Sequence, residues 1–200
     1  KNIHELSGVP TGGTEELKLL SLERTFEGTS PTTSVGVIDV SAATNAYATF
    51  LNSDVDASDN VRNWDMTGIT NMSRMFQGAT SYDGDISTWD VSSVTDMSSM
   101  FKSATLFNQD LSAWDAFLDN VSNMHSMFDG ASQFNQDIGT WDVSNVADMD
   151  AMFSDAANFN QDLGNWDVSN SLSMDSMFRN TGQFNQDLTE WCVNLISVEP

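Results

Sequence analysis

The stretch from Asp85 to Gln109 reads DISTWDVSSVTDMSSMFKSATLFNQ, and closely similar stretches precede and follow it. A Met-Phe pair recurs with the same period, from Met75-Phe76 to Met177-Phe178. Dense self-similarity of this kind is typical of a chain that stacks one structural unit per repeat, so we predict a solenoid of about seven turns. One tryptophan marks each regular repeat, and only the interval after Trp114 is longer than the others: Trp64, Trp89, Trp114, Trp141, Trp166 and Trp191.

The apolar residues change their period within each repeat. Trp89 and Val91 alternate with polar residues, which is the pattern of a half-buried strand. The next apolar residues follow the i, i+3, i+4, i+7 spacing of one helix face: Met97, Met100, Phe101 and Ala104. The sequence therefore predicts an α/β repeat solenoid with a parallel sheet on one face and short helices on the other.

The repeat continues upstream in a weakened form. Ile38-Asp39-Val40-Ser41 matches Trp89-Asp90-Val91-Ser92, and Phe50 precedes Phe76 by nearly the same interval that separates the later Phe residues. Terminal repeats are commonly atypical because one of their faces meets water. We predict a single domain in which residues 1–60 form degenerate N-terminal capping turns and residues 61–200 form the regular repeats. Because no cap is evident before Pro200, we expect the chain to be part of a longer protein.

The composition excludes several classes of partner. The formal net charge is -22, from 29 acidic and 7 basic residues, which disfavours nucleic acid and anionic membranes. No apolar run approaches the roughly 18 residues of a membrane span, so membrane insertion is not expected. The lone Cys192 cannot form an internal disulfide. Cations, basic proteins and neutral glycans are compatible with this charge.

Two rows of aspartates follow the repeat. Strand alternation places the residue after each Trp on the exposed face of the predicted sheet, and we name these residues the post-Trp row: Asp65, Asp90, Asp115, Asp142 and Asp167. The second row, the loop row, precedes each strand: Asp85, Asp110, Asp137, Asp162 and Asp187. Asparagines accompany it at 108, 135, 160 and 185. Such Asp and Asn side chains commonly bond neighbouring backbone groups in turns, which predicts that the loop-row oxygens are occupied.

The post-Trp row is the candidate binding site. Like charges stacked about 5 Å apart repel unless amides, hydroxyls or cations compensate them. Oxygen-only, irregular coordination suits Ca²⁺, so Asp90, Asp115 and Asp142 are the candidate metal ligands and Ca²⁺ is the candidate cofactor. A row of solvated carboxylates beside Ser and Thr is the alternative.

The aromatic rows have a similar pair of interpretations. The Trp row could stack sugars, but its place beside Val favours the core, so we predict that Trp89, Trp114, Trp141 and Trp166 are buried. The Met rows have the spacing of packing residues rather than of metal ligands. Two extra residues within 115–120 predict a bulge or a widened connection at the strand exit that leaves the Met124 column in register. Phe117 then either projects from the turn or fills the slot of Val91.

The motif Leu-x-x-Trp-x-Val-x-x-Val, followed by Met-Phe and Phe-Asn-Gln-Asp, resembles the repeat of the BspA-type leucine-rich-repeat surface proteins. The same repeat is found in mycoplasma surface lipoproteins. The resemblance covers about residues 60–196 and implies a leucine-rich-repeat-like solenoid exported to the cell surface for adhesion or partner binding.

The sequence carries no signature of an enzyme. His4 and His125 occupy different structural slots, and the carboxylates form repeated rows instead of one asymmetric pair. We therefore expect a non-catalytic, extracellular or cell-surface recognition module that binds a protein or glycan through the exposed sheet face. One alternative is a structural spacer or shell component, stabilised by calcium, without a macromolecular ligand. The other is a glycosidase-like enzyme, for which only the longer turn after Trp114 breaks the repetition.

Overall fold

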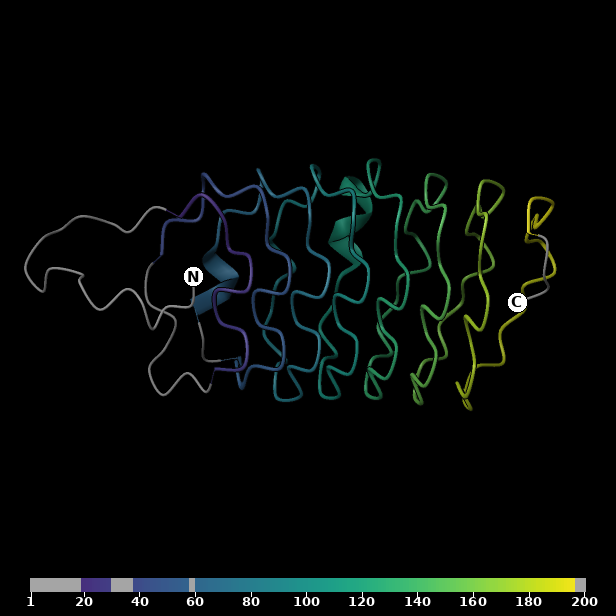
Figure 1. The fold of residues 1–200 in the computed structure, drawn as a ribbon. Coiled ribbons are helices and arrows are strands. Elements are labelled where there is room, and N and C mark those ends of the chain that lie inside the picture. The colour runs from purple at the N-terminus through teal and green to yellow at the C-terminus, as the bar shows by residue number, and fades with distance from the viewer. Residues whose placement is uncertain (1–18, 30–37, 58–59, 197–200) are drawn as a thin grey trace, which may run out of the picture.

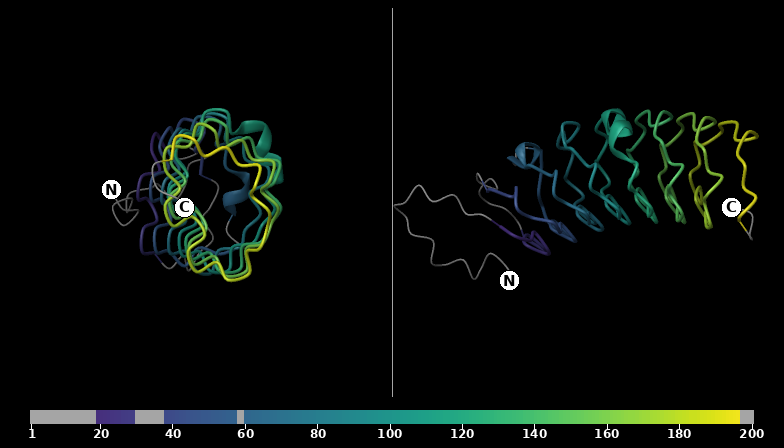
Figure 2. Two further views of the ribbon diagram at one scale, coloured as in Figure 1. Left: turned by 90° about the vertical axis from the view of Figure 1, so that its right-hand side faces the viewer. Right: turned by 90° about the horizontal axis from the view of Figure 1, so that it is seen from above.

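The computed structural model describes residues 19–29, 38–57 and 60–196. Within these ranges the chain winds into successive turns that stack side by side along one axis (Figure 1). Seen along that axis, the turns overlie one another as loops of similar outline (Figure 2). Two 3₁₀ helices are present in the described part of the chain, η2 over Asn60–Asn63 and η3 over Ser112–Phe117. The repeat thus builds stacked turns of nearly constant shape.

The predicted parallel sheet and helices are wrong. Apart from η2 and η3, the described residues form turns and loops, and neighbouring turns are joined by isolated parallel bridges instead of continuous strands. These bridges fall on one residue per turn: Asn45↔Asn71, Asn71↔Asp96, Asp96↔Asn123, Asn123↔Asp148 and Asp148↔Ser173. The chain is therefore not an α/β solenoid of the leucine-rich-repeat type.

The segment predicted as a helix, residues 97–104, is a series of tight turns. The backbone N–H groups of Met100 and Ala104 donate to carbonyl oxygens three residues earlier, at 3.1 and 2.9 Å. The N–H groups of Met97, Ser99 and Phe101 instead donate to the next turn, at 3.0, 2.7 and 2.9 Å. In an α-helix, each N–H group beyond the first turn would donate to the carbonyl oxygen four residues earlier in the same segment. Here every second donor joins two turns, which ties the stack together.

These tight turns require left-handed backbone in two columns along the stack. The first column is Arg24, Ala48, Arg74, Ser99, Ser126, Ala151 and Ser176, with φ between 53° and 58°. The second column is Gly28, Asn52, Gly78, Ser103, Gly130, Asp155 and Asn180, with φ between 53° and 72°. A left-handed conformation at a residue with a Cβ costs about 1–2 kcal/mol. The repeated inter-turn hydrogen bonds and the core must offset this cost.

The core is a set of aligned side chains. Trp89, Trp114, Trp141 and Trp166 are each at most 3% exposed, which confirms the prediction that they are buried. The indole N–H of Trp114 donates to the carbonyl oxygen of Ile86 in the preceding turn at 3.3 Å. The indole N–H of Trp141 donates to the carbonyl oxygen of Leu111 at 3.1 Å. A Trp held in this way is not available as a surface platform for sugars.

Phenylalanine rings form two further stacks through the core. In the first stack, the ring centroid of Phe101 lies 5.6 Å from that of Phe76 and 5.5 Å from that of Phe128, and the ring planes are 2° and 7° apart. In the second stack, Phe134 lies 6.1 Å from Phe107 and 6.0 Å from Phe159. Offset stacks of this kind contribute about 0.5–1.5 kcal/mol per pair beyond area burial. The aromatic stacks therefore fix the register of one turn on the next.

The two extra residues near position 117 are accommodated in η3. The bridge between Asp96 and Asn123 is kept, and Met124 N donates to Asp148 O at 2.9 Å, so the predicted register of the Met column is confirmed. Leu118, not Phe117, fills the slot of Val91, because Leu118 is fully buried and its carbonyl accepts Val121 N at 2.9 Å. Phe117 is only partly buried.

The described parts of the predicted capping segment follow the same pattern. Leu22 N donates to Asn45 O and Phe26 N to Thr49 O, both at 2.8 Å, and the rings of Phe26 and Phe50 stack at 5.1 Å. Residues 1–18, 30–37 and 58–59 of that segment, and 197–200 at the other end, lie outside the described residues. Among the described residues, no helix is long and apolar enough to cross a membrane.

Candidate functional site

The post-Trp row consists of aspartates whose Oδ1 atoms accept backbone hydrogen bonds. Asp142 Oδ1 accepts Ser144 N, and Asp167 Oδ1 accepts Ser169 N, both at 3.0 Å. Asp65 and Asp90 accept the N–H two residues later in the same way, at 3.1 and 2.9 Å. Asp115 differs, because it lies within η3 and its Oδ1 accepts the N–H of Asp142 in the next turn at 3.0 Å. One carboxylate oxygen per residue is thus occupied.

The burial of this row partly follows the prediction. Asp142 and Asp167 are exposed as expected, whereas Asp90 is partly buried. Binding of Ca²⁺ by Asp90, Asp115 and Asp142 stays a prediction.

The loop row makes the same local turn. Asp85 Oδ1 accepts both the N–H and the hydroxyl of Ser87, at 3.0 and 2.7 Å. The Oδ1 atoms of Asp110, Asp137, Asp162 and Asp187 accept the N–H two residues later at 2.8–3.0 Å. Backbone bonding by the loop row is therefore confirmed. The expected contrast between occupied oxygens in the loop row and free oxygens in the post-Trp row is wrong, because Asp65, Asp90, Asp142 and Asp167 make the same local turn.

A third row of such turns lies at the bridged residues, and the sequence reasoning missed it as a row. Asp96 Oδ1 accepts Ser98 N at 2.9 Å, Asn123 Oδ1 accepts His125 N at 3.0 Å, and Asp148 Oδ1 accepts Asp150 N at 3.0 Å. The recurrence of Asp or Asn just before four of the five first Met residues was the available signal, with Ser173 before Met174 as the exception. The same local turn is thus used at a third position of the repeat.

Hydrogen bonds to the carboxylates offset the electrostatic repulsion between stacked aspartates. The hydroxyl and N–H of Ser144 lower the pKa of Asp142, and they outweigh burial and the charge of Asp167, which raise it. The hydroxyl and N–H of Ser169 likewise lower the pKa of Asp167. Both carboxylates are thus held in their charged form at neutral pH.

An amide row stands beside these acidic rows, formed by Asn108, Asn135, Asn160 and Asn185. Asn108 Oδ1 accepts Asn135 N at 2.9 Å, Asn135 Oδ1 accepts Asn160 N at 2.9 Å, and the pattern continues to Asn185 N at 3.0 Å. Glutamines reinforce the row, since Gln161 Nε2 donates to the carbonyl oxygen of Asn135 at 2.8 Å. These asparagine side chains therefore tie each turn to the backbone of the next.

The orientation of the amide row leaves donors for a ligand. Because a backbone N–H faces each Oδ1, the Nδ2 group is directed away from the ladder. Within the described residues, the Nδ2 groups of Asn108, Asn135 and Asn160 donate to no protein acceptor. These three residues line an open groove of about 430 Å³, together with Gln133, Asn158 and Gln183. We name this the amide groove.

Comparison with known proteins gives a family. No curated protein and no solved structure matches the chain. A family model described as a Mycoplasma protein of unknown function, DUF285, matches residues 44–119 and 117–199. This match confirms the mycoplasma-type repeat but does not extend to the BspA type. Because the two matched stretches cover more than half of the 200 residues, the chain belongs to the DUF285 family of Mycoplasma proteins.

Proposed function

We propose that the chain is a non-catalytic recognition module outside the cell, and that it binds a neutral glycan in the amide groove. The observation that carries this proposal is the alignment of Nδ2 donors from Asn108, Asn135 and Asn160, one per turn. A repeated donor array suits a polymer with repeated acceptors, because stacked repeats create extended binding surfaces.

The chemistry of the groove favours a glycan over other ligands. Its six lining side chains are all amides, which both donate and accept hydrogen bonds as sugar hydroxyls do. Protein interfaces usually depend on aromatic or apolar anchors in pockets, and the lining offers none. The net charge of -22 repels anionic polymers, so the expected glycan is neutral.

The location outside the cell and the lack of catalysis belong to the same proposal. The location outside the cell is supported by the resemblance to BspA-type surface proteins. We propose this relationship to the BspA type as well. Lack of catalysis is supported by the hydrogen bonding of the carboxylates. Glycoside hydrolysis needs two carboxyl groups with opposed pKa shifts, whereas the pKa values of Asp142 and Asp167 are both lowered.

A structural spacer is the second candidate, and one observation favours it. The Oδ1 atoms of Asp142, Asp162 and their equivalents in both acidic rows are used within the protein. Carboxylates that each accept a hydrogen bond within the protein through Oδ1 support the stacking of turns without a ligand.

Matched pairs of variants test the proposed function. The wild-type chain is screened against immobilised neutral hexasaccharides of glucose, galactose, mannose and N-acetylglucosamine, and against a panel of basic proteins. The double variant Asn135→Asp with Asn160→Asp keeps both Oδ1 acceptors but removes the Nδ2 donors. The control Asp142→Asn with Asp167→Asn keeps the local turns and changes the charge in the opposite direction.

We expect wild type to bind one class of neutral glycan. The first double variant should weaken binding by about 10–100-fold, because two hydrogen bonds of about 0.5–1.5 kcal/mol are lost. The control should bind as wild type does. Loss of binding only in the control would assign recognition to the post-Trp row. If wild type bound only a basic protein, the ligand class would be protein and the proposal of a glycan would be wrong. No binding by wild type in either screen would favour the spacer.

A further inference from the structure

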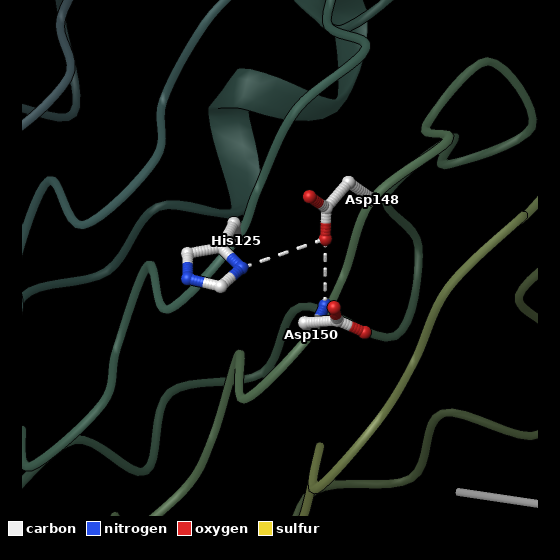
Figure 3. Close-up of side chains that lie close together, drawn as sticks. All are labelled: His125, Asp148 and Asp150. Carbon is white, nitrogen blue, oxygen red and sulfur yellow. Dashed lines mark hydrogen bonds and ion pairs between the residues drawn. The ribbon is translucent and has the colours of Figure 1, made fainter.

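His125 lies against a pair of carboxylates from the following turn. Its Nδ1 atom is 3.6 Å from Asp148 Oδ1, and Figure 3 shows the imidazole and the Asp148 carboxylate facing each other with Asp150 beside them. One ligand atom from each of His125, Asp148 and Asp150 lies within 4.8 Å of the other two. From this arrangement we propose that the three residues form a site for a first-row divalent transition metal ion such as Zn²⁺.

The fold holds the backbone of this site from both sides. Met124 N donates to Asp148 O at 2.9 Å and Ser126 N donates to Asp150 O at 2.8 Å, so the two neighbours of His125 are bonded to the two ligand-bearing residues. The bridge between Asn123 and Asp148 fixes the same alignment. Met124 and Met127 are fully buried and anchor the segment in the core. The histidine therefore stays opposite the carboxylates without any ligand.

The hydrogen bonds leave atoms of the cluster available. Asp150 Oδ1 accepts Asp175 N at 2.6 Å and the hydroxyl of Ser173, which orients its carboxylate. Oδ2 of Asp150 and Nε2 of His125 make no hydrogen bond within the described residues. Asp148 Oδ1 accepts Asp150 N and has a second lone pair. Each residue can thus offer one ligand atom while the turns stay intact.

The donor set selects the class of metal. Imidazole nitrogen suits Zn²⁺, Cu²⁺, Fe²⁺ and Ni²⁺, whereas Ca²⁺ and Mg²⁺ take oxygen ligands. Zn–N and Zn–O distances are about 2.0–2.2 Å and the coordination is tetrahedral, so ligand atoms on one ion are about 3.3–3.6 Å apart. Rotation of the exposed His125 side chain closes the difference from 4.8 Å. Three protein ligands leave a position for water.

The histidine is specific to this turn. The equivalent residues in the other described turns are Glu23, Tyr47, Ser73, Ser98, Asp150 and Asp175, so one turn alone places an imidazole beside the acidic pair. No Lys or Arg of the described residues forms an ion pair with Asp148 or Asp150, and the ion pair of Asp148 is with His125. The carboxylate pair therefore carries negative charge that a dication would neutralise. This inference is independent of the amide groove, because it involves none of the groove residues.

Calorimetric titration of the whole chain with Zn²⁺ at pH 7.5, in a buffer freed of transition metals and supplemented with excess Mg²⁺, tests the proposal. The variant His125→Ser gives this turn the residue that Ser98 supplies in the preceding one, so folding should be preserved. Asp150→Asn keeps the Oδ1 acceptor for Asp175 N. His4→Ala removes the chain's other histidine as a control.

We expect one Zn²⁺ per wild-type chain. His125→Ser and Asp150→Asn should each weaken binding by at least about 10-fold, since a single supporting residue already changes metal affinity about 10–100-fold. His4→Ala should bind as wild type does. Equal Zn²⁺ affinity in wild type and His125→Ser, loss of binding in His4→Ala, or displacement of Zn²⁺ by Mg²⁺ would overturn the proposal.

Discussion

Asn135 Oδ1 accepts the backbone N–H of Asn160 at 2.9 Å, so the side chain of one turn takes the place of a backbone acceptor for the next. The same oxygen also accepts Gln161 Nε2 at 3.0 Å. The backbone N–H of Asn160 thus depends on one side-chain atom, whereas Gln161 Nε2 also donates to the carbonyl oxygen of Asn135 at 2.8 Å. The relationship makes the amide row both a structural element of the stack and the source of its free Nδ2 donors.

Replacing this acceptor should loosen the stack. We expect Asn135→Ala to lower the free energy of unfolding by about 1 kcal/mol, because the backbone N–H of Asn160 loses its acceptor while Gln161 Nε2 keeps the carbonyl oxygen of Asn135. Asn135→Asp keeps the oxygen and should stay within about 0.5 kcal/mol of wild type. Urea unfolding in about 1 M salt, which screens the added charge, measures both. An equal loss in the two variants would show that the Oδ1 acceptor is not the stabilising atom.

The left-handed columns predict opposite effects for the same chemical change at two alanines. Ala151 has φ of 53°, so Ala151→Gly relieves about 1–2 kcal/mol of strain and loses about 0.5–1 kcal/mol in chain entropy. The net effect should be a stabilisation of about 0.5 kcal/mol. Ala156 is fully buried and outside these columns, so Ala156→Gly should destabilise by about 1 kcal/mol or more. Thermal unfolding of the two variants checks the sign, and destabilisation by both would argue against left-handed backbone at position 151.

The pKa of Asp85 predicts a dependence of stability on pH. The hydroxyl and N–H of Ser87, and then the charge of Arg62, hold this pKa below its ordinary value. A lowered folded-state pKa stabilises the protein above the unfolded value, about 3.9, and this stabilisation is lost as the pH falls through the folded value. Asp85→Asn should therefore have a lower Tm than wild type at pH 6, and the difference should shrink below about pH 4. A difference that grows on acidification would contradict this.

The repeat, the burial of the Trp row and the register across the two-residue insertion could be predicted from the sequence. Trp89 and its equivalents follow from their place beside apolar residues, and the Met124 column follows from the repeat spacing. The helix prediction failed for a physical reason. Tight turns with left-handed residues at Ser99 and Ser103 bury Met97, Met100, Phe101 and Ala104 as a helix would, and serine gives no warning of positive φ.

The site was only partly predictable. Alternation suggested free carboxylates in the post-Trp row, but Asp142 binds Ser144 N through the same local turn that the loop row uses. The Asn repeats were visible, whereas the ladder from Asn135 to Asn160 depends on the stacking of turns. The meeting of His125 with Asp150 likewise required the longer turn after Trp114 to be aligned with the regular ones.

Recognition through the amide groove is tested most directly by an NMR titration of side-chain amides with the neutral hexasaccharide that the screen identifies. The Nδ2 resonances of Asn135 and Asn160 should shift in proportion to bound glycan. The Nδ2 resonance of Asn170, which donates to Ser144 O at 2.9 Å, should remain unchanged. Shifts confined to the post-Trp row, or binding without any shift at Asn135 and Asn160, would contradict recognition through the amide groove.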